Sequence, residues 1–415
     1  LFCCLVVLKM STMKVLSGFI LLSCCLVVAA VDVACPSEGV RLGCKCKNQF
    51  GFYQVQCKNI DRIKDIPSWL PEYTRVLEIE NCDIRLLSNE SFKNLGNLTT
   101  LAITNQQHPL TFSDSLVFQG LRSLKNVFLD NNDIVSLPSG LFANLPNLRY
   151  VAINNNPLQT LPDNLLENST TVTRLEIKKT EFNRDITTKI ARGHFGKNIN
   201  ELFMSGTIIQ RLRNDFFFGL PKLKTLEIVS CGITHVGSDI LTGTHVTSFH
   251  LDGNPVKVID KNAFRRSKVR AFSCYGCQLT SNVVFDGFLK KTDLHSIFLT
   301  NNNITSIPHD AFTGLNNLDT LHLRGNPLVC DCDLMWLRSF ADHITVSDKV
   351  LWKCALPQNV SGKPFKSLTE SEMCDMPVTT NPTQNRTDKP SSDGTFFFIP
   401  YIILLFSVIA GVTAT

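Results

Sequence analysis

One apolar pattern recurs along most of this chain and limits the folds open to it. It is clearest from Leu124, where Leu124, Val127 and Leu129 hold its first, fourth and sixth positions and Asn132 holds its ninth. The same pattern begins again at Leu148. A single unit of this length cannot bury its own apolar side chains, so the units must stack on one another into a solenoid.

Eleven such units follow one another, and their first positions lie 23 to 27 residues apart. These first positions are Thr74, Leu98, Leu124, Leu148, Val172, Ile199, Leu223, Val246, Val269, Leu294 and Leu318. Each unit predicts a short strand whose apolar side chains point inward and whose third, fifth and seventh side chains point outward. The pattern therefore predicts an α/β solenoid, curved so that a parallel sheet lines its concave side.

Two further columns of residues fit the interior of this solenoid. The ninth position carries an amide that should hydrogen-bond buried backbone groups of its own turn and the next. It holds Asn132, Asn156, Asn254, Asn302 and Asn326, with Cys82, Cys231 and Cys277 in three other units. A second column is aromatic and should be core on the outer wall, at Phe92, Phe118, Phe142, Phe217, Phe264 and Phe312.

Eight of the sixteen cysteines form two groups of four that flank the repeats. The first group is Cys35, Cys44, Cys46 and Cys57, and the second is Cys330, Cys332, Cys354 and Cys374. Such groups indicate an oxidising compartment. They also meet a physical need, because the terminal repeats would otherwise expose an open apolar end and an unpaired strand edge.

The repeats together with these two cysteine groups resemble the extracellular leucine-rich repeat proteins of adhesion and recognition, such as connectin-like, Nogo-receptor-like and Slit-like molecules. The spacing of the second group, with Trp336 after Cys332, is part of that resemblance. The resemblance implies a horseshoe with a disulfide cap at each end. It also implies four pairings, which are Cys35 with Cys46, Cys44 with Cys57, Cys330 with Cys354, and Cys332 with Cys374.

The remaining cysteines of the repeats are interpreted as buried thiols. Cys274 holds an inward strand position three residues before Cys277. Two free core cysteines are the preferred interpretation of this pair, and a local disulfide is the alternative.

Composition shifts divide the rest of the chain. We expect a signal peptide over residues 1–30, starting at Met10 or Met13, with a membrane-spanning signal anchor as the alternative. An N-terminal cysteine-rich cap over 31–73, eleven repeats over 74–328 and a C-terminal cap over 329–375 should follow. Residues 376–394 are rich in Pro, Thr and Ser and predict a stalk.

The tail over 395–415 is apolar and carries no charge. Small residues precede it at Ser391, Ser392, Asp393 and Gly394, which favours a glycosylphosphatidylinositol signal. The alternative is a single transmembrane helix. Both place the protein at the outer face of the plasma membrane. Six Asn-x-Ser/Thr sequons predict glycosylation at Asn89, Asn97, Asn168, Asn303, Asn359 and Asn385.

No motif in the sequence indicates catalysis, so we expect no enzyme, no cofactor and no metal. There is no G-x-S-x-G, no H-E-x-x-H and no phosphate-binding Gly-rich loop, and the nine His have no metal-ligand spacing. A net charge of +5 over 415 residues gives no reason to expect nucleic acid as a partner.

With no catalytic motif, the feature of the sequence that can carry a function is the surface formed by the repeats. The outward strand positions predict a ligand-binding concave face, and the exposed aromatic residues among them are typical anchors of protein interfaces. The candidates are Phe128, Asp130, Tyr150, Arg174, Glu176, Lys178, Phe203, His250, Tyr275, Phe298, His322 and Arg324. A separate basic run, with Lys261, Arg265, Arg266, Lys268 and Arg270, is expected on the convex side as a solvated loop or a site for sulfated glycans.

These features favour a cell-surface adhesion or recognition protein that binds an extracellular protein or glycan and signals only through a transmembrane co-receptor. Three alternatives remain open. They are an innate-immune pattern-recognition receptor, a non-catalytic subunit of a secreted enzyme complex, and a matrix or heparan-sulfate-binding protein.

Overall fold

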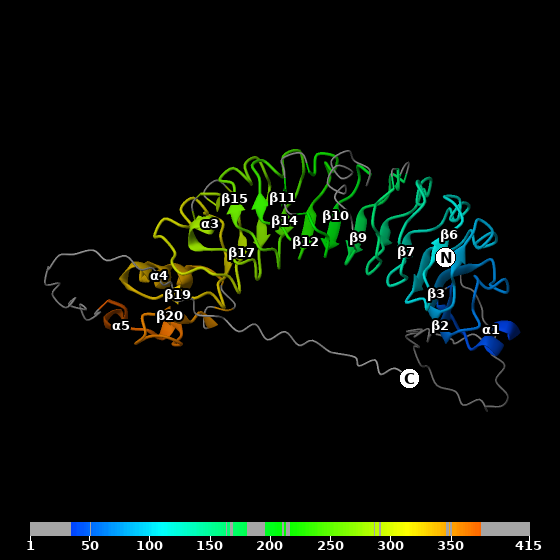
Figure 1. Cartoon of the computed structure of the whole chain (residues 1–415), viewed down its shortest axis with the longest axis horizontal. Helices are drawn as coiled ribbons and strands as arrows, with labels where there is room; N and C mark the ends of the chain where they lie inside the picture. Colours follow the sequence, from blue (N-terminus) through cyan, green and yellow to red (C-terminus); the bar gives the residue numbers. More distant parts are fainter. Residues whose placement is uncertain are drawn as a thin grey trace, which may run out of the picture. The chain divides into compact units, whose positions relative to one another are not determined.

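The computed structural model describes residues 35–49, 51–162, 164–166, 169–180, 196–209, 211–212, 216–285, 287–289, 292–345, 348 and 351–374. All of them belong to one compact unit, residues 1–374. Figure 1 shows this unit as a curved stack of turns, with the long sheet on the inner side of the curve and connecting loops on the outer side.

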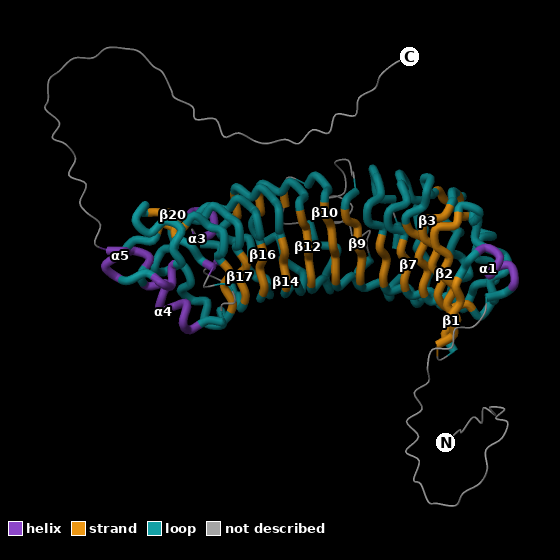
Figure 2. Tube along the Cα trace, turned by 90° about the horizontal axis from the view of Figure 1, so that it is seen from below, coloured by secondary structure: helices purple, strands orange, loops and turns teal. Residues whose placement is uncertain are grey.

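One sheet runs from the N-terminal cap through all eleven repeats, and its strands lie side by side in Figure 2. All neighbours in it are parallel except the first two strands, which are antiparallel. In order across the sheet, its strands are β1 (Lys45–Gln49), β2 (Phe52–Ile60), β3 (Thr74–Cys82), β5 (Thr100–Thr104), β7 (Asn126–Phe128), β8 (Tyr150–Ala152), β9 (Arg174–Lys178), β10 (Glu201–Ser205), β12 (Thr225–Val229), β14 (Ser248–His250), β16 (Ala271–Ser273), β17 (Ser296–Phe298) and β18 (Thr320–His322).

Short strands pair on the far side of the turns and make smaller sheets. These are β4 (Leu86–Leu87) with β6 (Thr111–Phe112), and β11 (Arg211–Leu212) with β13 (His235–Val236) and β15 (Val258–Ile259). The short helix α3 (Ser281–Phe285) lies within the ninth repeat, after its strand β16.

In the large sheet, each strand residue pairs with the residue at the same position of the neighbouring repeat. Tyr150 pairs with Arg174, and Arg174 with Glu201, so the third position of one repeat stands beside the third position of the next. The eleven first positions are at most 8% exposed. The outer phenylalanine column is also buried, and Phe118 stacks against Phe142 with ring centroids 5.7 Å apart. The predicted solenoid, with its concave parallel sheet, is confirmed.

Both ends of the stack are closed by disulfides. At the first end, Cys35 and Cys44 flank the helix α1 (Ser37–Leu42) and form the bonds Cys35–Cys46, to strand β1, and Cys44–Cys57, to strand β2. At the second end the bonds are Cys330–Cys354 and Cys332–Cys374. The elements of this cap are β19 (Leu328–Val329), η2 (Cys332–Leu334), α4 (Trp336–His343), β20 (Cys354–Leu356), η4 (Phe365–Ser367) and α5 (Glu370–Cys374). These are the pairings that the family resemblance implies.

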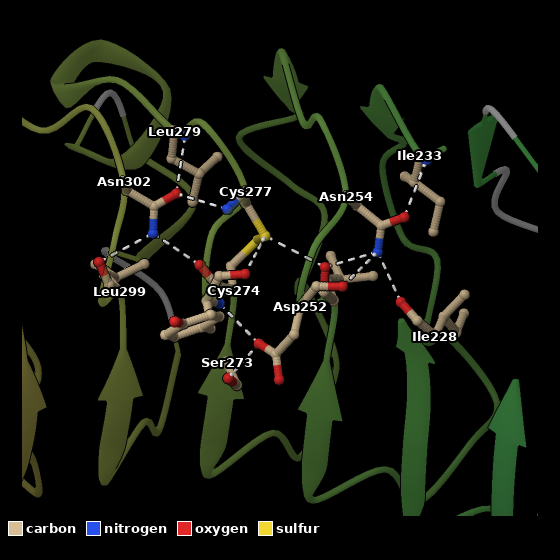
Figure 3. The surroundings of a disulfide bond; sticks show 12 residues. Ile228, Ile233, Asp252, Asn254, Ser273, Cys274, Cys277, Leu279, Leu299 and Asn302 are labelled. Atoms are coloured by element: carbon tan, nitrogen blue, oxygen red, sulfur yellow. Dashed lines mark hydrogen bonds between the residues drawn. A yellow bond between two sulfur atoms is a disulfide. The ribbon is translucent and has the colours of Figure 1, made fainter. Parts of the chain in front are cut away.

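The expectation of two free thiols at Cys274 and Cys277 is wrong, because the two residues form a disulfide (Figure 3). Both are fully buried. Cys274 holds the sixth position of its repeat and Cys277 the ninth, and in the other repeats both positions face the core. Two cysteines there lie 5.5 Å apart between their Cα atoms, which is within the range of ordinary disulfides. Cys82 and Cys231 are buried free cysteines, as expected.

Candidate functional site

The outward positions of the large sheet form a continuous row of polar and aromatic side chains. Along β10 and β12 the burial alternates between covered and partly exposed residues, so the third, fifth and seventh side chains of these repeats line the concave side. On β9, Arg174 and Lys178 are partly exposed, whereas the fifth-position residue Glu176 is buried. The structure therefore brings the predicted residues onto one face. Most of them touch a neighbour on the adjacent strand, which the sequence does not reveal.

The centre of the concave face is organised around Arg174 on β9. Its guanidinium lies over two rings, 4.9 Å from the centroid of Tyr150 and 4.6 Å from that of Phe203. The same side chain donates to Glu176 Oε1 from Nε at 2.9 Å and to Glu201 Oε2 from Nη1 at 2.9 Å. Ion pairs and cation–π contacts of this kind hold the two rings in fixed positions.

Lys178 closes this cluster on the far side of Phe203. Its Nζ lies 4.9 Å from the centroid of the Phe203 ring and 3.4 Å from Glu227 Oε1. Phe203 is thus flanked by two cations of its own molecule. It is partly covered by neighbouring side chains of the same sheet, and is a less open anchor than the sequence suggests.

Burial shapes the protonation of the acidic and phenolic groups around Arg174. Burial, and then the neighbouring Glu176 carboxylate, raise the pKa of Tyr150 to about 12. Glu176 is itself buried, which opposes its ionisation, but hydrogen bonds from Arg174 and Tyr150 leave its pKa below the usual value. One strand away, burial raises the pKa of Asp130, whose Oδ1 accepts from the backbone of Asn154 at 2.6 Å. The centre is therefore a charged, internally paired platform.

Aromatic contacts extend this platform toward both ends. Phe128 meets Tyr150 edge to face at 5.0 Å between centroids, and Phe298 lies against His322 at 4.9 Å. His322 in turn approaches Asp348 of the C-terminal cap, at 3.4 Å between Nδ1 and Oδ2.

Tyr275 stands apart from the other four concave aromatic residues because it is exposed. Half of its surface, 51%, reaches solvent, and the other four rings are only partly exposed. Two contacts fix its position, since Asp252 Oδ1 accepts from its backbone N–H at 2.7 Å and its hydroxyl accepts from Asn301 Nδ2 at 2.7 Å. An exposed ring that is held in place loses little conformational freedom when a partner covers it.

The described residues contain no group of three or more His, Cys, Asp or Glu able to hold a metal ion. His250 donates to or accepts from Ser248 on its own strand, at 2.7 Å between Nε2 and Oγ. Arg324 is exposed, and its backbone N–H donates to Asp348 at 3.3 Å. These candidate residues thus place polar groups on the concave side.

Comparison with known proteins agrees with the repeat register. The family model described as leucine rich repeat matches residues 122–182 and 282–328. Podocan of Mus musculus is 25% identical over 284 residues, which cover 67% of this chain and 44% of podocan. Platelet glycoprotein IX of Homo sapiens is 36% identical over 73 residues, or 18% of this chain and 41% of that protein.

This chain is a leucine-rich repeat protein. Its fold is similar to that in the solved structure of the Toll–Spatzle complex of Drosophila, with a TM-score of 0.50 and 21% identity. That match covers 72% of this chain and 48% of the other. The chain spans less than half the length of the curated relatives that it matches.

The buried ninth position of this leucine-rich repeat protein is occupied by other hydrogen-bonding residues besides asparagine. Gln106 fills it in the second repeat, where Nε2 donates to Ile79 O at 3.2 Å and Oε1 accepts from Ile84 N at 3.1 Å. Thr180 and Thr207 fill it in the fifth and sixth repeats and bond each other at 3.1 Å between hydroxyl oxygens. The register of the repeat was the signal that could have found these residues.

The four sequons inside the described part of the chain lie away from the concave strand positions. Asn89, Asn97, Asn303 and Asn359 are all exposed. Asn89 borders a depression of about 750 Å³, which lies among loops between the strands of the first repeats. Asn168 and Asn385 fall outside the described residues, as do the anchor candidates Ser391, Ser392, Asp393 and Gly394.

No helix in the described ranges is both long and apolar enough to cross a bilayer. The expected signal segment over 1–30, the stalk and the tail over 395–415 lie outside those ranges.

Proposed function

We propose that this leucine-rich repeat protein recognises an extracellular protein through its concave face, with Tyr275 as the principal anchor. The observation that carries the proposal is the exposed, hydrogen-bonded ring of Tyr275 in a row of ordered aromatic and charged side chains. Such a combination is typical of interface hot spots, where a rigid aromatic residue is surrounded by polar groups that exclude water.

Two further arguments support the proposal. Five disulfides and two cysteine-rich caps fit the oxidising space outside the cell. The solved structure of similar fold is of Toll in complex with Spatzle, so a solenoid of this kind can carry a partner. We further propose that the chain is glycosylated and held at the cell surface by its C-terminal tail, and that it acts in adhesion or together with a co-receptor.

The test uses the full chain displayed on cells and an array of purified extracellular protein domains as probes. Tyr275→Ala should weaken binding of a true ligand domain by at least tenfold, and Phe298→Ala should weaken it less, because Phe298 is already covered by His322. Tyr73→Ala is the matched control, since Tyr73 is also exposed but lies before the first repeat strand.

The concave model is wrong if every domain that binds tolerates Tyr275→Ala, or if Tyr73→Ala weakens binding equally. Surface display and thermal unfolding of each variant should match the parent chain. This check separates loss of a contact from loss of the fold.

A further inference from the structure

The residues immediately before the concave strands form a second, separate line across the sheet. They hold the second position of each repeat, and in the third to ninth repeats each donates its backbone N–H to the carbonyl of the previous one at 2.7 to 2.9 Å. In order they are Lys125, Arg149, Thr173, Asn200, Lys224, Thr247 and Arg270. All seven therefore lie in register along the edge where the parallel strands begin.

This edge is strongly basic. Three positions of each repeat contribute to it: the second position and the two residues that precede the first position. In the third to ninth repeats these positions together hold eight cations, one histidine and no carboxylate. We call these eight residues the basic edge, and all are exposed: Arg122, Lys125, Arg149, Lys197, Lys222, Lys224, Lys268 and Arg270. Against a net charge of only +5 for the chain, this concentration on one edge is high.

The charge of the basic edge is not paired within the described part of the chain. Within the described ranges, none of its eight residues takes part in an ion pair. Arg265, by contrast, makes two contacts to Asp239, at 3.0 Å from Nε and 2.6 Å from Nη2. The basic run expected on the convex side is thus divided, because Arg265 is paired whereas Lys268 and Arg270 lead into β16 and belong to the basic edge.

The middle of the basic edge is hollowed and lined with hydrogen-bonding groups. An open depression of about 530 Å³ is bounded by Arg149, Thr170, Thr171, Thr173, Asn198, Asn200 and Lys222. Its walls are held by bonds to backbone, since Asn198 Nδ2 donates to Thr170 O and Thr171 Oγ1 donates to Leu148 O at 2.7 Å. Guanidinium, ammonium and amide groups around one depression can all donate to sulfate oxygens.

We propose that the basic edge binds a linear sulfated polysaccharide that runs across the third to ninth repeats. The cations form a line, and strands about 4.8 Å apart make seven repeats span roughly 29 Å, which fits an extended polymer better than a compact ligand. Disulfides place the protein among extracellular partners, where sulfated glycans are linear polyanions. This inference goes beyond the proposed function, because the basic edge and the concave anchor Tyr275 are different residues.

The test measures binding of the full chain to heparin at two salt concentrations. The triple variant Arg149→Gln, Lys224→Gln, Arg270→Gln should weaken binding at least tenfold at physiological salt and flatten its salt dependence, because fewer cations displace counterions. The matched control is Lys261→Gln, Arg265→Gln, Arg266→Gln, which removes the same charge elsewhere and should change binding less than twofold. Tyr275→Ala should leave heparin binding unchanged.

Equal loss in both triple variants would overturn the proposal, since it would reveal attraction to net charge alone. It would also be overturned if polyglutamate or vesicles of anionic lipid bind as tightly as heparin and depend on the same residues. If the triple variant is not exported, acylation of the lysine amines of the parent chain, with and without bound heparin, tests whether heparin covers the basic edge. Bound heparin should then protect Lys125 and Lys224 but not Lys261, and equal labelling of the three would contradict the basic edge.

Discussion

Asn156→Ala tests whether the buried hydrogen bonds of a ninth-position amide stabilise the stack of repeats. The Asn156 side chain is buried and serves both its own turn and the previous one. Its Oδ1 accepts from the backbone N–H groups of Asn132 and Ile134, both at 3.0 Å, and its Nδ2 donates to Leu129 O at 2.9 Å. The substitution removes these bonds and leaves three backbone groups without this partner, in residues that water does not reach.

The expected cost follows from those three groups. A buried donor or acceptor left without a partner costs about 1–3 kcal/mol. Partial relaxation of the turn recovers some of this, so we expect a loss of about 3–5 kcal/mol in the free energy of opening around the fourth repeat. Asn147→Ala is the matched control, because Asn147 is exposed and makes one hydrogen bond, from Nδ2 to Arg122 O at 2.8 Å. It should cost under about 1 kcal/mol.

Native-state hydrogen exchange is the appropriate assay, because repeats of a solenoid can open separately and a single unfolding free energy is poorly defined. Exchange of the amides of Asn132 and Ile134 should accelerate at least about 100-fold in Asn156→Ala, since each 1.4 kcal/mol is a factor of ten. The reasoning is refuted if the two variants exchange within about fivefold of each other at these amides.

Two further predictions concern the cysteines. Alkylation of the unfolded, unreduced chain should label Cys82 and Cys231 and leave Cys274 and Cys277 unlabelled until reduction; labelling of the last two without reduction would contradict their disulfide. Cys354→Ser should reduce secretion by costing the C-terminal cap about 2–5 kcal/mol, whereas Cys231→Asn, which restores the common ladder residue, should be secreted normally; equal export of both variants would count against the cap.

The sequence predicts the interior of this protein well because the same residue types recur at fixed positions of the repeat. Leu124, Val127 and Leu129 are buried in the structure because a strand in this register leaves them no other side to face. The ninth-position asparagines are equally predictable, since few other side chains satisfy both donors and acceptors inside the turn. Gln106 was missed because only its place in the register marks it.

Contacts between repeats are less predictable from the sequence. Arg174 contacts Tyr150, 24 residues before it, and Phe203, 29 residues after it, and nothing local in the sequence shows that one guanidinium covers both rings. The disulfide between Cys274 and Cys277 was only the alternative to two free thiols for a related reason. Their spacing alone does not show that the sixth and ninth positions converge in the core.

A further regularity explains how a turn of this protein ends. The eighth position of every repeat has a positive φ, from 50° at Asn81 to 74° at Gly325. Asparagine and glycine tolerate that conformation best, and they hold most of these positions. At Gly325 a Cβ would meet the Asn301 side-chain oxygen and would lie 3.3 Å from Asn301 Cα, so a larger residue there would also require the Asn301 side chain to move.

In-register parallel stacking turns each position of the repeat into a line across the molecule. The ninth position forms the buried ladder, the third, fifth and seventh positions form the concave face, and the second position contributes to the basic edge. Contacts between neighbouring strands break the concave line into local clusters, such as the one around Arg174, and such clusters suit a globular partner. The basic edge has no such ion-paired clusters among the described residues, and its cations form a line that is interrupted only at the fifth and eighth repeats. The two surfaces therefore differ in the shape of ligand that they can match.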